Sequence, residues 1–245
     1  INRALTGIAL LGTTGWVLAT APLLLWLALC SVAVGMLMLA MGLKLAAFVA
    51  QLSAPPEPHR PLPGTFTEGG RQRPRVSLLV PMYREPEMAS TLIARLSRLT
   101  YPKALIEVHL LVEEHDLATQ EAIAQEPLPS WLHVICLPKG RIATKPRALN
   151  AALPFCRGDI VGIYDTEDAP DPDQIDRVVA HFASAPPEVV CLQGALDYYN
   201  ASSSWIARCF TIEYATWFRM ILPGVARMGL PIPLGGTTVF SAAHR

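Results

Sequence analysis

A cluster of carboxylates directly follows an apolar, β-branched run near the middle of the sequence. Asp165, Glu167 and Asp168 come immediately after residues 160–164, which have the composition of a buried strand. Carboxylates this close together repel one another unless a cation or a proton lies between them. Such oxygen ligands suit Mg²⁺ or Mn²⁺. The segment therefore predicts a metal site at a strand end, with a capped turn of solvated acids as the alternative.

A basic segment at residues 139–150 carries the opposite charge. Lys145 and Arg147 stand in the first turn of a helix predicted over residues 144–153. Cations at a helix amino terminus oppose the helix dipole, whereas free N–H groups together with Lys and Arg suit a phosphate. We therefore expect this segment to bind an anion, and a plain basic surface helix is the alternative.

Two further strand ends carry polar side chains. Pro81, Tyr83 and Glu85 follow the largely apolar segment 76–80, and Glu113 and Glu114 follow the strand expected over residues 106–112. A tyrosine ring can pack against a base or a sugar, and carboxylates can accept hydrogen bonds from ribose or base donors. Each segment alone also fits an ordinary turn or a solvated loop. In open α/β sheets, however, ligands bind in the crevice at the carboxyl ends of the strands.

Several other chemistries lack support in the sequence. It contains no G-x-G-x-x-G segment, no P-loop and no HExxH spacing. Residues 165–176 lack the central glycine and the final glutamate of a calcium loop. The formal net charge of zero provides no bulk attraction to nucleic acid, so we expect no nucleic-acid partner.

The elements that position these groups alternate along the chain, with Asp171 as the expected cap of the fourth helix and Pro172 at its first position. This alternation predicts an α/β fold with a largely parallel sheet. Strands are expected over residues 76–80, 106–112, 131–137, 159–164 and 189–195, and helices over residues 87–99, 117–125, 144–153, 172–184 and 203–222.

The amino-terminal segment has the composition of membrane spans. Between Ala4 and Ala50 the only charged residue is Lys44. One span needs about 20 apolar residues, so two are predicted, near residues 5–19 and 23–43. Basic residues flank the pair on both sides, so the positive-inside rule predicts a hairpin with both ends in the cytoplasm. We expect a transmembrane hairpin over residues 1–50, a proline-rich linker over residues 51–74 and an α/β domain over residues 75–245.

Taken in this order, five segments resemble the membrane-bound, processive-type glycosyltransferase family 2, which includes bacterial cellulose and hyaluronan synthases. The resemblance covers residues 75–245 and implies a GT-A fold that binds a nucleotide-diphosphate sugar with Mg²⁺ or Mn²⁺. The segments are residues 80–85 (VPMYRE), 145–150 (KPRALN) and 164–168 (YDTED), Gln193 with residues 198–200 (YYN), and residues 234–237 (LGGT).

The resemblance also implies roles for individual residues. Asp165 and Glu167 take the positions of the D-x-D motif that holds the metal and the donor diphosphate, and Asp168 can share that role because the usual second aspartate is a glutamate here. The family pattern further implies a base-reading carboxylate at Glu113 or Glu114 and diphosphate contacts by Lys145 and Arg147. Donor binding extends to Pro81, Tyr83 and Glu85, and the acceptor side comprises Gln193, Gly235, Gly236 and Thr237.

The implied activity is that of an inverting, metal-dependent hexosyltransferase of the bacterial inner membrane, multi-pass, with its catalytic domain in the cytoplasm. The donor is expected to be a UDP-sugar, and the acceptor a growing polysaccharide or a lipid-linked molecule. The family's catalytic-base and gating motifs are expected beyond Arg245, and a first residue other than methionine also fits a fragment of a longer protein. The alternatives are a non-processive, lipid-linked glycosyltransferase and a catalytically inactive GT-A-like membrane scaffold or nucleotide-binding module.

Overall fold

The computed structural model describes residues 6–7, 12, 15–16, 19–53, 73–140, 144–198 and 200–242. The chain divides into two compact units, residues 1–55 with 215–232 and residues 56–214 with 233–245. Most of the first predicted span (residues 5–19) and most of the proposed linker (residues 51–74) lie outside the described residues. The three-part division of the chain stays a prediction.

The first unit contains the long apolar helix α2, Pro22–Leu52. Its 31 residues correspond to about 46 Å of helix, more than the roughly 30 Å hydrocarbon core of a bilayer. Among the described residues, α2 is the one helix that is long and apolar enough to cross a membrane. The prediction of two spans is therefore reduced to one candidate, because a second helix of that length is not found in the described part of residues 1–21.

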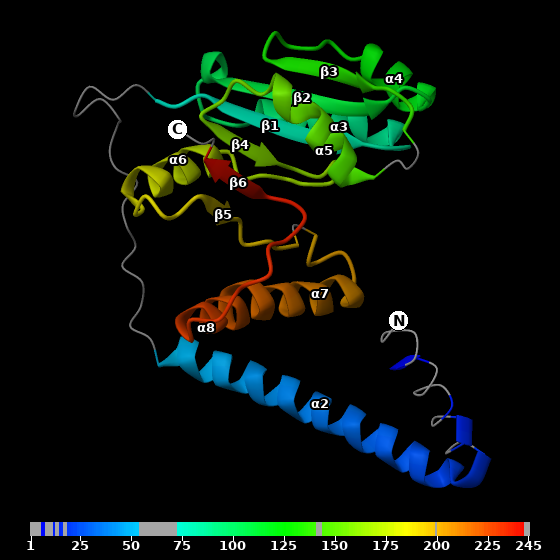
Figure 1. Cartoon of the computed structure of the whole chain (residues 1–245). Coiled ribbons are helices and arrows are strands. Elements are labelled where there is room, and N and C mark those ends of the chain that lie inside the picture. Colours follow the sequence, from blue (N-terminus) through cyan, green and yellow to red (C-terminus); the bar gives the residue numbers. More distant parts are fainter. Residues whose placement is uncertain are drawn as a thin grey trace. The chain divides into compact units, whose positions relative to one another are not determined.

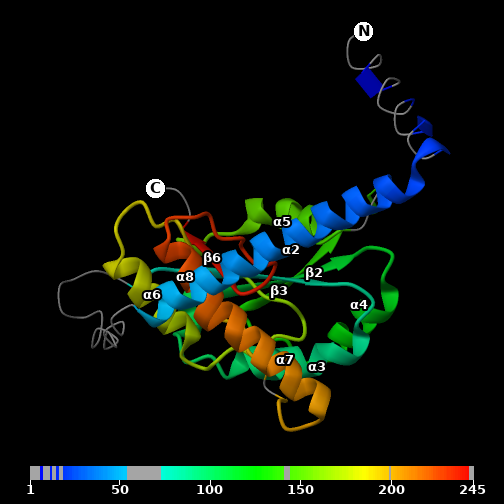
Figure 2. The same cartoon turned by 90° about the horizontal axis from the view of Figure 1, so that it is seen from below.

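The π-helical turn and the short helix at residues 217–227 pack against α2 in the same unit. The predicted helix over residues 203–222 is α7, Trp205–Thr216, which continues through a π-helical turn, Trp217–Ile221, into α8, Leu222–Arg227. The π-helical turn precedes Pro223, which lacks the N–H of a regular helix. A Cβ on Gly224 would lie 1.9 Å from the carbonyl oxygen of Ala47, so α8 and α2 meet backbone to backbone (Figures 1 and 2).

The second unit is built on a six-stranded sheet with the order β3-β2-β1-β4-β6-β5 (Figure 1). β1 to β4 are parallel, whereas β6 is antiparallel to both β4 and β5, so the predicted α/β fold with a mostly parallel sheet is confirmed. The sequence pattern gave no indication of β6, and the fifth strand is shorter than expected. The strands are Val76–Met82, Ile106–Glu113, Leu132–Leu137, Ile160–Ile163, Cys191–Gln193 and Val239–Ala242.

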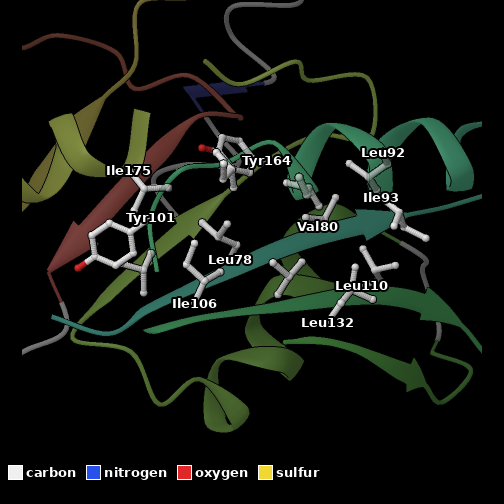
Figure 3. Packing of buried hydrophobic residues seen from close by; sticks show 14 of the residues in the cluster. Leu78, Val80, Leu92, Ile93, Tyr101, Ile106, Leu110, Leu132, Tyr164 and Ile175 are labelled. Atoms are coloured by element: carbon white, nitrogen blue, oxygen red, sulfur yellow. The ribbon is translucent and has the colours of Figure 1, made fainter. Parts of the chain in front are cut away.

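Helices cover both faces of this sheet because β1 and β2 are buried on both sides. On one face, β1 residues such as Leu78 and Val80 pack with apolar residues of α3, α4 and α6 (Figure 3). On the other face, Leu79 and Leu111 pack with Ala148 and Ala152 of α5. The helices are α3 Ala89–Ser97, α4 Leu117–Ala124, α5 Lys145–Ala152 and α6 Gln174–Ser184, and the 3₁₀ turns are Pro86–Met88, Lys103–Leu105 and Leu153–Phe155.

The start of α6 differs from the prediction. The helix begins at Gln174 with Asp173 as its cap, rather than at Pro172 with Asp171 as its cap. The carbonyl of Pro172 accepts hydrogen bonds from the backbone N–H of Thr100 (2.8 Å) and from its hydroxyl (3.0 Å). This tertiary contact holds residues 171–173 in a turn and delays the helix by two residues.

The centre of the sheet is packed closely around Gly162 of β4. A Cβ at this position would lie 2.6 Å from the ring of Phe240 and 2.8 Å from Leu78. The Phe240 ring in turn lies edge to face with Tyr164, at a centroid distance of 5.8 Å. The Tyr164 hydroxyl donates to Gln174 at 2.6 Å, which ties the end of β4 to the first turn of α6. The strand end that carries the acidic segment is thereby anchored in the core.

A buried polar network lies near the amino-terminal ends of β1 and β2. The hydroxyl of Ser77 donates to Glu107 and accepts from the N–H of Gly158 (2.8 Å), and Glu107 also accepts from the N–H of Arg157 (2.5 Å). His109 is buried beside this network, with Nε2 at 3.6 Å from the Glu107 carboxylate, and neither ring nitrogen makes a hydrogen bond to any residue that the structure describes. Burial lowers the pKa of His109, although the nearby Glu107 carboxylate opposes the shift. The folded protein therefore resists protonation of this ring.

We expect the free energy of unfolding to fall as the pH drops below about 6.5, because the unfolded chain protonates His109 while the folded chain does not. His109→Gln removes the titrating group and should reduce this slope between pH 7 and pH 5. Urea denaturation at a series of pH values measures it, and an identical slope in the variant would contradict the assignment.

Candidate functional site

A cavity of about 310 Å³ opens at the carboxyl ends of the parallel strands in the second unit. Parallel strands bring the segments that follow β1, β2 and β4 to the same edge of the sheet. Seven of the predicted site residues line the cavity, namely Pro81, Tyr83, Glu85, Glu113, Lys145, Asp165 and Glu167. Met82, Leu111, Leu137, Thr144, Ala148 and Thr166 complete the lining.

One cation and one carboxylate of this cavity form an ion pair. Lys145 is the first residue of α5, and its Nζ contacts Oδ1 of Asp165, which follows β4. The two side chains are 30% and 29% exposed, so the pair is only partly screened by water. Thr144 precedes the helix in an extended conformation, and its side chain makes no capping hydrogen bond. Thr144 and Lys145, at the amino terminus of α5, both line the cavity.

A second ion pair lies deeper. Nη1 of Arg147 donates to both carboxylate oxygens of Glu113, at 2.8 and 3.0 Å, and Nη2 donates to the carbonyl of Pro138. The Glu113 side chain is only 6% exposed. Gly140 makes room for this arrangement, since a Cβ there would lie 2.3 Å from Nε of Arg147. Arg147 supports the cavity from behind and is not among the residues that line it.

The side chains of Glu113 and Glu114, which the sequence left as alternatives, point in different directions. Glu113 is the last residue of β2 and faces the cavity. The carboxylate of Glu114 instead accepts from the backbone N–H of Lys139 at 3.3 Å. Successive residues of a strand point to opposite faces, so only one of the two reaches the cavity.

The rim next to β1 is shaped by a turn with a left-handed residue. Arg84 has a φ of 57°, and its N–H donates to Asp116 at 2.5 Å. Burial raises the pKa of Asp116, but hydrogen bonds from Arg84 and from Thr119 outweigh it and bring the pKa below its usual value. This turn leaves the Tyr83 ring 41% exposed at the cavity, 5.8 Å from the ring of His115.

A hydroxyl connects the segments after β1 and β4. The Thr166 side chain is buried and donates to the carboxylate of Glu85, while the N–H of Glu85 donates to Thr119 at 3.2 Å. Glu85 is therefore held at the cavity wall by a neighbour that the sequence analysis did not single out.

Asp168 lies behind the cavity rather than in its lining. Its Oδ2 accepts from the N–H of Asp165 at 2.8 Å, from the hydroxyl of Thr237 and from the hydroxyl of Thr238 at 3.4 Å. Burial raises the pKa of Asp168, the charges of Asp165 and Glu167 raise it further, and the hydrogen bonds from Thr237 and Asp165 partly offset these effects. In this structure the carboxylate orients the acidic segment.

Arg95 of α3 holds the same segment from the other side. Its Nη1 donates to the carbonyl of Glu167 at 2.7 Å and to the carbonyl of Asp168 at 3.4 Å. No local pattern in the sequence marks Arg95, because the contact joins residues more than seventy positions apart. Its helical position, on a face directed at the strand ends, is the only signal available.

The predicted acceptor-side residues form a loop held by β5. The side chain of Gln193 accepts from the N–H of Gly235 at 2.7 Å and donates to the carbonyl of Thr237 at 3.0 Å. A Cβ on Gly235 would lie 3.1 Å from Gln193, whereas a Cβ on Gly236 would meet nothing within 4 Å. These four residues lie together but do not line the cavity.

The carboxylates of Asp165 and Glu167 fit a metal ion that is also bound by phosphate oxygens and water. Among the described residues no group of three His, Cys, Asp or Glu side chains is arranged around a common point. Asp165 and Glu167 nevertheless both line the cavity. Mg²⁺ is commonly held by one or two carboxylates together with substrate phosphates and water, and this two-carboxylate arrangement fits that mode.

The Thr237 hydroxyl makes two hydrogen bonds that join the acidic segment to the loop before β6. It accepts from the N–H of Asp165 at 3.0 Å and donates to Asp168. Thr237→Val keeps the shape but removes both bonds, so we expect a loss of about 1–3 kcal/mol in the free energy of unfolding. Thr237→Ser retains the hydroxyl and serves as the control. If the valine variant and the wild type were equally stable in urea denaturation, the two hydrogen bonds of Thr237 would not contribute to stability.

Part of this sequence is similar to known proteins. Two curated relatives are similar: Glucomannan 4-beta-mannosyltransferase 7 of Arabidopsis thaliana is 27% identical over 161 residues, 59% of this chain and 29% of the relative. Beta-monoglucosyldiacylglycerol synthase of Synechocystis sp. is 31% identical over 113 residues, 45% of this chain and 23% of the relative. This chain thus spans less than a third of either protein.

Among solved structures, the mannosyltransferase PcManGT of Pyrobaculum calidifontis, in complex with GDP-Man and Mn²⁺, is 24% identical, with a TM-score of 0.48, over 69% of this chain and 49% of that protein. The family described as "Glycosyltransferase like family 2" matches residues 74–244, which is most of the chain. The chain therefore belongs to glycosyltransferase family 2, as its motifs indicated.

Proposed function

We propose that this chain forms the donor-binding part of a membrane-associated glycosyltransferase that transfers a hexose from a nucleotide-diphosphate sugar. The observation that carries the proposal is the meeting of Lys145, Asp165 and Glu167 in one cavity at the carboxyl edge of the sheet. A cation, a helix terminus and two carboxylates together suit a diphosphate with its metal ion.

The cavity has room for a nucleotide, and different residues of the cavity face the diphosphate, the nucleoside and the base. Its volume of about 310 Å³ falls in the range of small-molecule sites. In the proposal the diphosphate lies at Lys145 and the amino terminus of α5, with Arg147 behind. The exposed ring of Tyr83 packs against the base, and Pro81, Glu85 and Glu113 line the nucleoside side. The base is uracil in the proposal, and guanine is the competitor that the test must separate.

The metal ion is Mg²⁺ or Mn²⁺, held by Asp165 and Glu167. It supplies positive charge where negative charge builds up on the departing diphosphate. Lys145 adds to that stabilisation from the helix side. Asp168 accepts the N–H of Asp165, so in the proposal it orients the metal-binding segment rather than binding the metal as first expected.

Transfer forms a bond between the acceptor oxygen and the anomeric carbon and breaks the bond from that carbon to the diphosphate. Inversion requires a carboxylate that takes the proton of the acceptor hydroxyl. We propose that this base follows Arg245 in the whole protein. The loop of Gly235, Gly236 and Thr237, positioned by Gln193, forms the acceptor side. α2 anchors the protein in the cytoplasmic membrane with the sheet unit in the cytosol, where a polysaccharide or a lipid-linked molecule accepts the sugar.

The central test is nucleotide binding by the full chain in detergent. With Mn²⁺ present, titration calorimetry should show binding of UDP in preference to GDP, and EDTA should abolish it. Asp165→Ala should weaken binding by about tenfold to a hundredfold, because a charged ligand group is lost. Asp171→Ala is a matched control, since Asp171 is exposed and pairs only with Arg177 among the described residues.

Equal UDP affinity in Mn²⁺ and in EDTA would contradict the metal role. Absence of any nucleotide binding in the wild type would favour the alternative, a GT-A-like scaffold without catalysis.

A further inference from the structure

The ion pair between Lys145 and Asp165 affects how a metal ion and a nucleotide can bind in the cavity. Both residues line the cavity, and they come from different elements, the first turn of α5 and the segment after β4. In the part of the chain that the structure describes, Asp165 is the only hydrogen-bond or ion-pair partner of the Lys145 side chain. The ammonium group is thus placed directly on a carboxylate that the proposed function assigns to the metal.

The two cationic side chains of α5 differ in how firmly they are held. Arg147 uses both terminal nitrogens, on Glu113 and on the carbonyl of Pro138, and its carboxylate partner is nearly buried. Among the described residues, the Lys145 side chain has one polar partner, and it is 30% exposed. A lysine is a compact charge on a flexible stem and can change partners at low cost, whereas a guanidinium that makes several bonds cannot. Lys145 is therefore the mobile cation of the site and Arg147 the fixed one.

An ammonium and a divalent cation compete for the same carboxylate. They repel each other when both lie against it, and the repulsion is strong because the site is only partly solvated. A diphosphate removes this conflict, since its oxygens provide a second place for the ammonium group. Metal and diphosphate together can then replace the ion pair more easily than the metal alone.

We propose that Lys145 is an internal counter-ion of Asp165 that must be released for metal binding and then transfers to the donor diphosphate, so that metal and nucleotide bind cooperatively. This rests on the proposed function, because it assumes that Asp165 holds the metal. It assigns Lys145 two opposite effects. The lysine weakens binding of the metal alone and strengthens binding of the nucleotide with metal. A lysine that only contacts phosphate would show the second effect without the first.

The test measures Mn²⁺ binding to the full chain in detergent without nucleotide, by electron paramagnetic resonance of the free ion. Lys145→Met should tighten Mn²⁺ binding by about fivefold, the size expected for loss of a partly exposed ion pair. Lys145→Arg keeps the charge and should bind Mn²⁺ as weakly as the wild type. In the same preparations, Lys145→Met should weaken binding of UDP or GDP in the presence of Mn²⁺, so its two affinities move in opposite directions.

Lys139→Met is the matched control for loss of one positive charge near the site. Only the backbone N–H of Lys139, and not its side chain, is bonded to the acidic residue Glu114. The proposed transfer of Lys145 from Asp165 to the diphosphate is contradicted if Mn²⁺ binds equally well to the wild type and to Lys145→Met. It is also contradicted if Lys139→Met tightens Mn²⁺ binding by the same factor. These outcomes differ from failure of the proposed function, in which the wild type binds no nucleotide even with Mn²⁺.

Discussion

Carboxylates gathered at one edge of a sheet can coexist only if each of them is compensated. Two such charges 4 Å apart repel by about 4 kcal/mol in the partly solvated surroundings of a protein surface. Here Asp165 is compensated by Lys145, Glu113 by Arg147, and Asp168 by hydroxyl and N–H donors. Two carboxylates of the site are therefore paired with cations, and the chemistry of the site depends on which of these two ion pairs can be exchanged.

The architecture explains why the matched groups meet. The parallel arrangement of β2, β1 and β4 places the segments after these three strands at one edge. α5 is packed against the sheet through Ala148 and Ala152, which fixes its amino terminus beside that edge. The antiparallel strand β6 then brings Thr237 under the acidic segment. The segments proposed for the donor side and the acceptor side are thus joined by hydrogen bonds from Thr237 and Thr238 to Asp168.

Sequence reasoning found most of the fold because the strands are short apolar runs and the helices have clear polar boundaries. It missed β6, whose four residues follow a stretch rich in proline and glycine and have no alternating pattern long enough to detect. It placed the start of α6 two residues early, since the contact between Pro172 and Thr100 is tertiary and leaves no local trace. The same reasoning proposed two membrane spans where the described residues hold one candidate helix.

For the site, residue types and strand ends predicted that the segments after β1, β2 and β4 lie at one edge of the sheet, and seven of the predicted residues, including Lys145 and Asp165, line the cavity there. The sequence could not predict whether Glu113 or Glu114 faces the cavity, because this depends on where β2 ends and on which face of the strand each side chain lies. Nor could it predict that Asp168 turns to Thr237, or that Arg95 holds the acidic segment, because both contacts join residues about seventy positions apart. Motifs indicate which residues matter, and packing decides which of them bind and which of them position others.

The most direct test of the account is the location of the metal in a complex. Anomalous scattering from crystals of the full chain grown with Mn²⁺ and UDP or GDP would locate the ion independently of the protein geometry. The account predicts one strong peak beside Asp165 and Glu167, next to the diphosphate, with Lys145 turned toward the phosphate oxygens. A nucleotide bound at this edge with the Lys145–Asp165 pair intact and no metal beside it would contradict the account.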